Sequence, residues 1–262
     1  MLAIGRICYP YQKWLITNDG YELLTSQKWF GSYLNINGCT TPCYNDSFNA
    51  YGWLMSETKK HWENVYLTKS PLKVSWYQQE PVLSVSLIAS AGLAPDAPII
   101  DVGGGSSTLV DKLQDEAYTN ISVLDISGSA LAHSKIRLAD KADKVHWYEA
   151  DVTRFEAPHR FALWHDRAVF HFLTKKADRE RYVNVLKQTL EKGGHIIIMT
   201  FATDGPNKCS GLDIVQYDAE KLTVELGPGF KLVETGHEVH HTPAGNQQKF
   251  AYFHLRAPEE AV

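Results

Sequence analysis

The sequence has few cysteines and no long apolar run. Its four cysteines are too few for a disulfide scaffold in 262 residues, which favours a reducing, cytoplasmic compartment. The Cys39-x-x-x-Cys43 pair has no matching second pair, so we expect no zinc or other metal site. No stretch approaches the roughly 20 apolar residues that a membrane helix needs. The first ten residues lack a small-residue cleavage site, so we expect neither a secretory signal nor a membrane partner.

Charge of one sign is also lacking. The formal net charge is −4 and the pI is about 6.3, which leaves no basic patch and makes nucleic acid a poor candidate partner. Hydrophobic residues at 44% and charged residues at 21% exclude a disordered chain or a coiled coil. The length fits one α/β unit with an extension. The pattern gives no indication of the oligomeric state.

Residues 1–54 differ from the remainder. They hold 11 of the 30 aromatic residues and three of the four cysteines, but only six charged residues. Neither a helical nor a strand period persists there, so we predict little regular structure and assign this aromatic-rich extension no role. At Ser56 the pattern changes to an amphipathic helix, with this serine as the N-cap. We therefore expect the working domain to span residues 55–262.

Strand and helix patterns alternate after residue 80. Helices are predicted at 81–91, 107–116, 129–139, 175–191 and 218–226, and strands at 97–102, 121–126, 144–149, 161–165 and 195–201. This alternation predicts an α/β fold, a doubly wound parallel sheet with helices on both faces. Two further β-rich runs, 230–241 and 247–255, flank a turn and predict a hairpin at the edge of the sheet.

A glycine-rich turn gives the sharpest local signal. In Ile99-Ile-Asp-Val-Gly-Gly-Gly-Ser-Ser-Thr108 a buried strand leads into three glycines and then into a helix. Glycines let the backbone pass close to a ligand, and the helix N-terminus offers free N–H groups to a polar group. A tight strand-to-helix turn without a ligand would look similar, so the turn needs support from other residues.

Carboxylates at the ends of the next two strands provide that support. Asp125 lies 20 positions after Gly105, the distance at which an acid meets ribose hydroxyls in a nucleotide-binding βαβ unit. Asp151 follows the third strand at the same carboxyl edge of the sheet. Each alone is compatible with a solvated loop, but with Asp101 they make three acids at successive strand ends. This set indicates a nucleoside site.

The spacing of the glycines helps to distinguish a dinucleotide site from an S-adenosylmethionine site. A dinucleotide fingerprint requires Gly-x-Gly-x-x-Gly, whereas here Thr108 takes the third position. A carboxylate at Asp101 would repel a pyrophosphate but attract the α-amino group of an amino-acid tail. These features favour S-adenosylmethionine and disfavour a nicotinamide dehydrogenase.

Residues 55–256 resemble a class I S-adenosylmethionine-dependent methyltransferase. The matching stretches are Asp101-Val-Gly-Gly-Gly105, Leu124-Asp125, Ala150-Asp151-Val152, Trp164-His-Asp-Arg167 and Gly193-Gly-His-Ile-Ile-Ile198. The resemblance implies a Rossmann-like seven-stranded sheet with an antiparallel C-terminal hairpin. It also implies that the cofactor-binding residues are Asp101, Gly103, Gly104, Gly105, Asp125, Ile126, Asp151, Val152 and, in a lid over the site, Tyr77.

Methyl transfer from a sulfonium is an in-line displacement with a neutral leaving group, so a base is needed only for a protonated acceptor. By position in the family, Asp166 would sit near the reacting methyl. His171 is a candidate base, although packing between two phenylalanines explains it equally well. Predicted substrate-binding residues are Trp76, Arg167 and Cys209. Arg167 would clamp an anionic acceptor or pair with a neighbouring aspartate.

Residues at the end of the predicted fourth strand give an indication of the methyl acceptor. Trp164-His-Asp-Arg-Ala-Val-Phe170 is similar to small thiol and oxyanion methyltransferases of the thiopurine and tellurite type. The layout also resembles protein-lysine methyltransferases, which often carry Asp-Lys-Gly where this chain has Asp166-Arg-Ala168. We expect methyl transfer from S-adenosylmethionine to a small-molecule acceptor. The preferred acceptor group is a thiol or another soft nucleophile. The alternatives are a protein-lysine N-methyltransferase and a non-catalytic S-adenosylmethionine-binding module.

Overall fold

The structure is a computed structural model that describes residues 14–17, 20–23 and 56–259. The chain divides into two units, Met1–Trp53 and Leu54–Val262. In the first unit, strands β1 (Trp14–Thr17) and β2 (Gly20–Leu23) form an antiparallel hairpin. The other residues for which we predict little regular structure lie outside the described residues. The division falls next to the boundary predicted at residue 55, which stays a prediction for the working domain.

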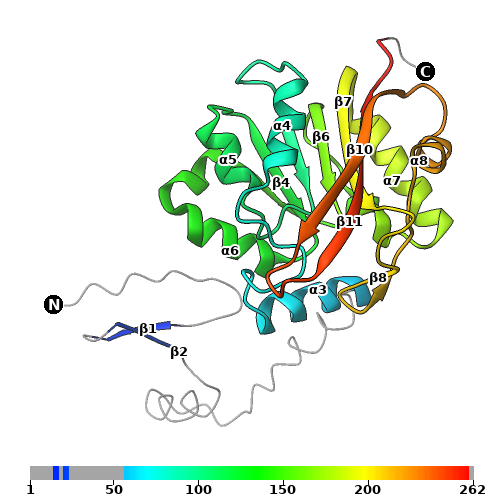
Figure 1. Ribbon diagram of the computed structural model, residues 1–262. Helices are drawn as coiled ribbons and strands as arrows, with labels where there is room; N and C mark the ends of the chain where they lie inside the picture. Colours follow the sequence, from blue (N-terminus) through cyan, green and yellow to red (C-terminus); the bar gives the residue numbers. More distant parts are fainter. Residues whose placement is uncertain (1–13, 18–19, 24–55, 260–262) are drawn as a thin grey trace, which may run out of the picture. The chain divides into compact units, whose positions relative to one another are not determined.

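The second unit is built on a seven-stranded sheet with the order β10-β11-β7-β6-β3-β4-β5 (Figure 1). The strands are β3 (Ile99–Val102), β4 (Ile121–Asp125), β5 (Val145–Glu149), β6 (Phe161–Arg167), β7 (Leu190–Phe201), β10 (Lys231–His241) and β11 (Gln247–Arg256). Strands β3 to β7 pair in parallel, whereas β11 runs antiparallel to both β7 and β10. The predicted seven-stranded sheet with an antiparallel C-terminal hairpin is confirmed.

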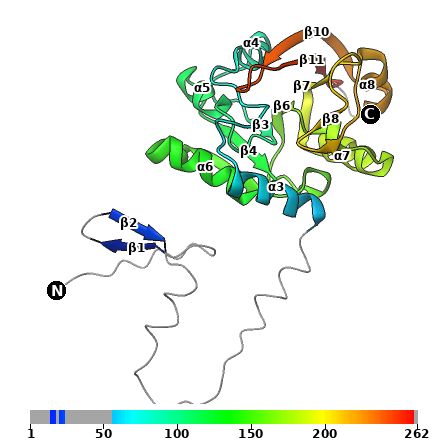
Figure 2. The same ribbon diagram turned by 60° about the horizontal axis from the view of Figure 1, so that its bottom comes forward.

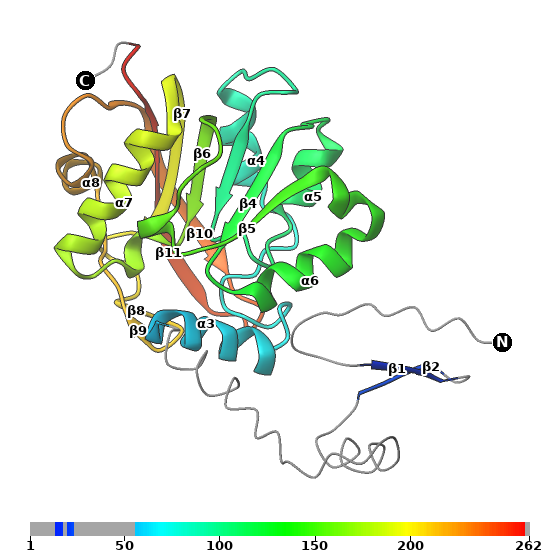
Figure 3. The ribbon, with the colours of Figure 1, turned by 180° about the vertical axis from the view of Figure 1, so that it is seen from behind.

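Helices cover both faces of the sheet. They are α3 (Glu57–Thr68), α4 (Val82–Ser90), α5 (Leu109–Asp115), α6 (Gly128–Leu138), α7 (Lys176–Thr189) and α8 (Ala219–Leu226). Apolar side chains of α4, α5 and α6 pack into one core, and those of α7 and α8 pack into a second core on the opposite face. Figure 3 shows α7 in front of the sheet on this second side. None of these helices is both long and apolar enough to cross a membrane.

The structure differs from the predicted pattern near residue 190 and in the loop after β7. The helix predicted to reach Glu191 ends at Thr189, because β7 already begins at Leu190, which pairs with Phe161. The polar loop after β7 contains two short strands, β8 (Lys208–Cys209) and β9 (Leu212–Asp213), which the sequence pattern did not predict. Two-residue strands are too short to show an alternating pattern.

Strand alternation decides which side chains share a face. On β6, Leu163 packs into the core beneath α4, and Trp164 packs into the core beneath α7. Successive side chains of a strand point to opposite faces, so His165 and Arg167 face the α4 side and Asp166 faces the α7 side. The chain passes from β3 through β4 to β5 and returns to β6 on the other side of β3. Ligands bind at such a switch point in open α/β sheets.

Helix α3 lies across the carboxyl ends of the strands (Figure 2). As predicted, Ser56 is its N-cap, and the Ser56 side chain accepts a hydrogen bond from the Lys59 amide. The carboxylate of Glu63 accepts hydrogen bonds from the amides of Gly128 and Ser129, which ties α3 to the first turn of α6. Helix α3 therefore closes the edge at which the parallel strands end.

Candidate functional site

A cavity opens at the carboxyl ends of β3 and β6. It lies between the glycine turn after β3 and the segment 71–78 that follows α3. Six of the residues predicted for the site line it: Trp76, Tyr77, Asp101, Gly103, Gly104 and Arg167. The cavity thus brings together predicted residues from three parts of the chain: the segment 71–78, the glycine turn and the end of β6.

Asp101 lines this cavity, and one of its carboxylate oxygens has no hydrogen-bond partner among the described residues. Its Oδ1 lies 2.7 Å from Nδ1 of His165, and its Oδ2 is buried without a hydrogen-bond partner among the described residues. A Cβ atom at Gly104 would overlap Oδ2 of Asp101. Only glycine therefore lets the turn pass this close to the carboxylate.

Asp125 lies beneath the third glycine. Its Oδ1 accepts a hydrogen bond from the Ser127 amide at 2.8 Å, and a Cβ atom at Gly105 would lie 2.5 Å from its Oδ2. Burial raises the pKa of Asp125 to about 7, against the lowering effect of the Ser127 amide. Ile126, the next residue, is half-buried. Asp125 is thus held at the end of β4, outside the cavity lining, and its contact with ribose hydroxyls stays a prediction.

Asp151 and Val152 stand apart from the cavity lining. The Asp151 side chain accepts hydrogen bonds from the amide and hydroxyl of Thr153, at 2.9 and 2.8 Å, and so caps the short 3₁₀ turn Val152–Arg154. Val152 packs in the core on the α7 face. Their predicted place beside the adenine stays a prediction.

Asp166 is fully buried on the face opposite the cavity. It accepts hydrogen bonds from the amides of Val169 and Phe170, and Tyr182 of α7 donates its hydroxyl to Oδ2 at 2.6 Å. Burial raises the pKa of Asp166 to about 6, against the lowering effect of these hydrogen bonds. Both oxygens are occupied within the protein, so the contacts of Asp166 fix the turn after β6. Its predicted role near the methyl group stays a prediction.

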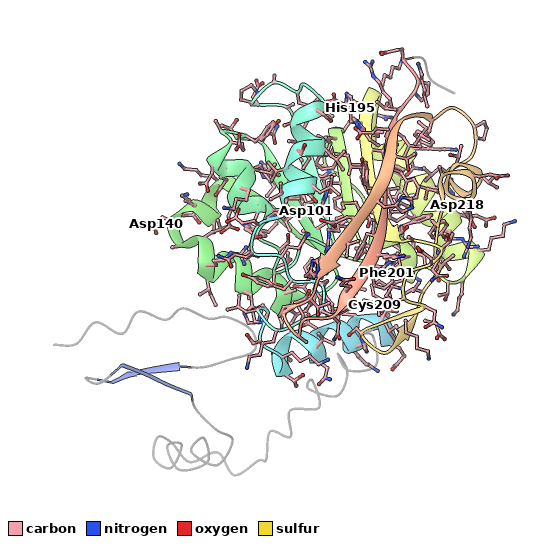
Figure 4. The ribbon with its side chains drawn as sticks, in the orientation of Figure 1. Asp101, Asp140, His195, Phe201, Cys209 and Asp218 are labelled. Atoms are coloured by element: carbon pink, nitrogen blue, oxygen red, sulfur yellow. The ribbon has the colours of Figure 1, made fainter. Side chains whose placement is uncertain are left out.

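His171 and Cys209 lie in an apolar cluster beyond the cavity lining. The His171 and Phe201 rings lie 4.9 Å apart between centroids and are tilted by 44°, and Cys209 packs with Phe201 and Phe250. Burial, with a smaller effect of Arg167, lowers the pKa of His171 to about 3. Burial raises the pKa of the Cys209 thiol to about 11. Near pH 7 both groups are therefore uncharged. Figure 4 shows Phe201 and Cys209 at the α3 end of the sheet.

Aromatic side chains of α3 complete a wall above the site. Trp62 packs edge-on against Trp76 and Phe172, with ring centroids 5.6 and 5.1 Å apart. Trp76 donates its indole N–H to the Tyr66 hydroxyl at 3.2 Å, and Tyr66 lines the cavity. Our sequence reasoning identified Trp76 but missed Trp62 and Tyr66. Their spacing of four residues in a predicted helix places them on one face, which was the available signal.

Arg167 is the cation of the cavity wall. Its Nη1 donates to the backbone oxygen of Trp76 at 3.1 Å, and its guanidinium lies over the ring of Phe250 at 4.6 Å. Nη2 lies 3.7 Å from a carboxylate oxygen of Glu238 on β10, beyond hydrogen-bond distance. Both Nε and Nη2 are buried without a hydrogen-bond partner in the described part of the chain. The acid near Arg167 is thus a glutamate from the C-terminal hairpin, where we had expected an aspartate.

These residues fit S-adenosylmethionine. The free oxygen of Asp101 suits an α-amino group, the glycine turn leaves room for the methionine part, and Asp125 suits ribose hydroxyls. Within residues 56–259 and the short N-terminal hairpin, no group of three or more His, Cys, Asp or Glu side chains could hold a metal ion.

Comparison with known proteins agrees with this geometry. Residues 99–194 match a family model described as a methyltransferase domain. The curated proteins gave no match.

Solved structures share the fold. An S-adenosylmethionine-dependent methyltransferase from Anabaena variabilis has a TM-score of 0.61 and 17% identity, over 78% of this chain and 96% of that one. The N-methyltransferase NodS from Bradyrhizobium japonicum, in complex with S-adenosylhomocysteine, has a TM-score of 0.60 and 15% identity, over 78% of this chain and all of that one. A protein from work on thioacetal formation in echinomycin biosynthesis has a TM-score of 0.65 and 13% identity, over 79% and 94% of the two chains.

The matched region contains the glycine turn, Asp125 and the strand that carries Arg167. Residues 99–194 are thus similar to a methyltransferase domain, and the second unit has the fold of class I S-adenosylmethionine-dependent methyltransferases.

Proposed function

We propose that this enzyme methylates a small-molecule acceptor through a soft, anionic nucleophile, with a thiolate first. The observation that carries the proposal is the Arg167 guanidinium, which is buried in the cavity wall with two nitrogens that lack hydrogen-bond partners among the described residues. Glu238 lies 3.7 Å from Nη2, beyond hydrogen-bond distance, so N–H groups of this buried cation remain available to an anionic acceptor.

The cofactor supplies an electrophilic methyl group on a sulfonium. Asp101 and the glycine turn would hold the methionine part, and Asp125 would hold the ribose. The aromatic wall of Trp62, Tyr66 and Trp76 would exclude water from the reacting centre. Fixing the two reactants in line, away from water, lowers the barrier for such a displacement.

Arg167 also accounts for the state of the acceptor. A cation close to a thiol lowers its pKa and increases the thiolate fraction near neutral pH. No protein base is then needed for proton removal. This agrees with the pKa of about 3 for His171, which makes its imidazole a weak base, and with the occupied oxygens of Asp166.

Protein-lysine methylation is less well supported by these contacts. A lysine acceptor approaches as an ammonium ion, which Arg167 would repel. An exposed acidic groove near residues 203–213 would favour such a substrate, but the acids there are paired with lysines: Asp204 with Lys249, and Asp213 with Lys208. The small-molecule acceptor is therefore the proposal that we test first.

The test incubates the full chain with S-adenosylmethionine that carries a labelled methyl group, in parallel with a panel of small thiols and with lysate protein. We expect label on a thiol, and a loss in kcat/KM of about ten- to a hundred-fold in Arg167→Gln, the range for a charge-assisted hydrogen bond. S-adenosylhomocysteine affinity should stay unchanged. The control is Arg181→Gln, which removes an exposed arginine of α7.

Label on lysate protein with none on the thiols would contradict the proposed acceptor. Binding of the cofactor without any transfer would favour the non-catalytic module. Arg167→Lys keeps the charge and provides a second folded variant, in which part of the thiol activity should return.

A further inference from the structure

A chain of three buried side chains runs behind the cofactor turn. His165 Nδ1 lies 2.7 Å from Asp101 Oδ1, and His165 Nε2 lies 3.0 Å from the hydroxyl of Ser84 on α4. All three side chains are almost inaccessible, with at most 3% of each residue exposed. Asp101 and His165 are direct neighbours in the parallel pairing of β3 with β6. The register of the sheet therefore builds this contact.

The hydrogen-bond chain fixes how the carboxylate points. An ionised carboxylate only accepts hydrogen bonds, so His165 must donate from Nδ1 to Asp101. Ser84 then fixes the ring from the other side through Nε2. With Oδ1 held in this way, Oδ2 of Asp101 is the atom left without a partner among the described residues, on a side chain that lines the cavity.

The glycine turn makes this orientation specific. A Cβ atom at Gly104 would overlap Oδ2 of Asp101, so the turn is shaped around this oxygen. Figure 4 shows Asp101 in the middle of the fold beside α4. Asp166 follows His165 on β6 but faces α7, where its oxygens accept hydrogen bonds within the protein. It therefore does not compete with Asp101 for the hydrogen bond of His165. Arg167 lines the same cavity and is the nearest cation of β6 on this face.

We propose that His165, supported by Ser84, is a positioning residue for the amino-acid end of the cofactor. It holds Asp101 so that Oδ2 accepts a hydrogen bond from the α-amino group of S-adenosylmethionine. The proposal rests on the cofactor assignment of the proposed function and adds a residue to it. His165 also borders the cavity, and in this proposal it acts through Asp101.

Loss of the His165 donor would have a selective consequence. Asp101 Oδ1 would be buried without a hydrogen bond, which disfavours the ionised carboxylate and frees it to rotate. The bond to the ammonium group would weaken, whereas contacts of the adenosine part would not change. The effect should therefore appear only for ligands that carry the amino-acid tail.

The experiment measures the affinity of the full chain for two ligands by calorimetry. S-adenosylhomocysteine carries the amino-acid tail, and 5′-methylthioadenosine lacks it. In His165→Leu we expect S-adenosylhomocysteine to bind about ten- to a hundred-fold more weakly, the range for a hydrogen bond to a charged group. The affinity for 5′-methylthioadenosine should change less than about two-fold, within the scatter for sites without direct contact.

Two further variants separate positioning from folding. His165→Asn places an amide N–H close to the position of Nδ1, so it should restore most of the S-adenosylhomocysteine affinity. His195→Leu removes another half-buried histidine, in the middle of β7, whose Nδ1 lies 2.8 Å from Nε2 of His254 (Figure 4), and should affect neither ligand selectively. If His165→Leu does not fold, the comparison of His165→Asn with Ser84→Ala uses the same two ligands, and Ser84→Ala should show the weaker, tail-selective loss.

The outcomes distinguish the two assignments. An equal loss for both ligands, or no loss for either, would overturn the role of His165 while leaving the cofactor site in place. A wild-type chain that binds neither ligand would overturn the cofactor assignment, and the positioning role with it.

Discussion

The carboxylate of Glu63 on α3 accepts a hydrogen bond of 2.7 Å from the backbone amide of Gly128, the first residue of α6. A negative side chain at a helix N-terminus satisfies a free N–H group and interacts favourably with the helix dipole. Helix α6 begins three residues after Asp125, the last residue of β4. This contact therefore anchors α3, which carries the aromatic wall, close to the end of β4.

Replacing Glu63 by alanine should therefore loosen α3. We expect the free energy of unfolding to fall by about 0.5–2 kcal/mol, as for the loss of a helix cap. Amide hydrogen exchange in α3 should increase more than in α7. The matched control is Glu57→Ala, which removes an exposed glutamate of the same helix that pairs with Lys60 and should cost less than about 1 kcal/mol. Equal effects of the two variants would contradict the anchoring role.

Stability should depend on pH through Asp125. Burial raises the pKa of this carboxyl from 3.8 to about 7. A raised pKa favours the folded state at low pH, and this contribution is lost as pH rises through the folded pKa. Relative to Asp125→Asn, the wild-type free energy of unfolding should fall between pH 4 and pH 7, by up to about 4 kcal/mol. Urea unfolding at several pH values measures the difference, and a constant difference would show that the carboxyl is not desolvated.

Tyr182 should stabilise the turn after β6 in a pH-dependent way. Its hydroxyl accepts from the Trp164 indole at 2.8 Å and donates to Asp166 at 2.6 Å. Tyr182→Phe leaves both groups without this partner, at a cost of about 1–3 kcal/mol. The pKa of Asp166 is about 6, so the cost should be larger at pH 8, with the carboxylate ionised, than at pH 5.

The control for this variant is Tyr252→Phe, whose hydroxyl donates to Glu234 at an exposed position. Thermal denaturation at both pH values compares the two. A cost for Tyr182→Phe that equals that of the control would contradict the buried network.

Gly103 should be irreplaceable in the cofactor turn. It has φ of +69°, and a Cβ atom there would overlap the side chain of Val169. Gly103→Val should abolish S-adenosylhomocysteine binding in a chain that still folds, as measured by calorimetry and circular dichroism. Gly211→Val, at φ of +81° with open space around it, carries similar backbone strain without the overlap and should keep binding. Retained binding in Gly103→Val would show that the turn is only structural.

The order of the elements was predictable because each depends on a local pattern. The strands that end at Asp125 and Glu149, and the helix after Ser56, show their periods within about ten residues. The grouping of the three acids at strand ends was also predictable, because the carboxyl ends of parallel strands meet at one edge of the sheet.

Contacts between distant segments were not predictable in this way. His165 was passed over in favour of Asp166, because a motif gives a position in the chain but not the face of a strand. Glu238 approaches Arg167 from β10, the edge strand of the sheet, although two other strands lie between β10 and β6 in the sheet order. Trp62 reaches Phe172 across 110 positions, a separation at which no sequence period operates.

The central claim is that the turn at Gly103 to Gly105, between Asp101 and Asp125, binds the adenosyl cofactor. A calorimetric titration of the full chain with S-adenosylhomocysteine, beside Asp125→Ala, tests it most directly. The account predicts saturable binding at one site, with an affinity about ten- to a hundred-fold weaker in the variant. Absence of binding to the wild-type chain, or equal affinities of the two proteins, would contradict it.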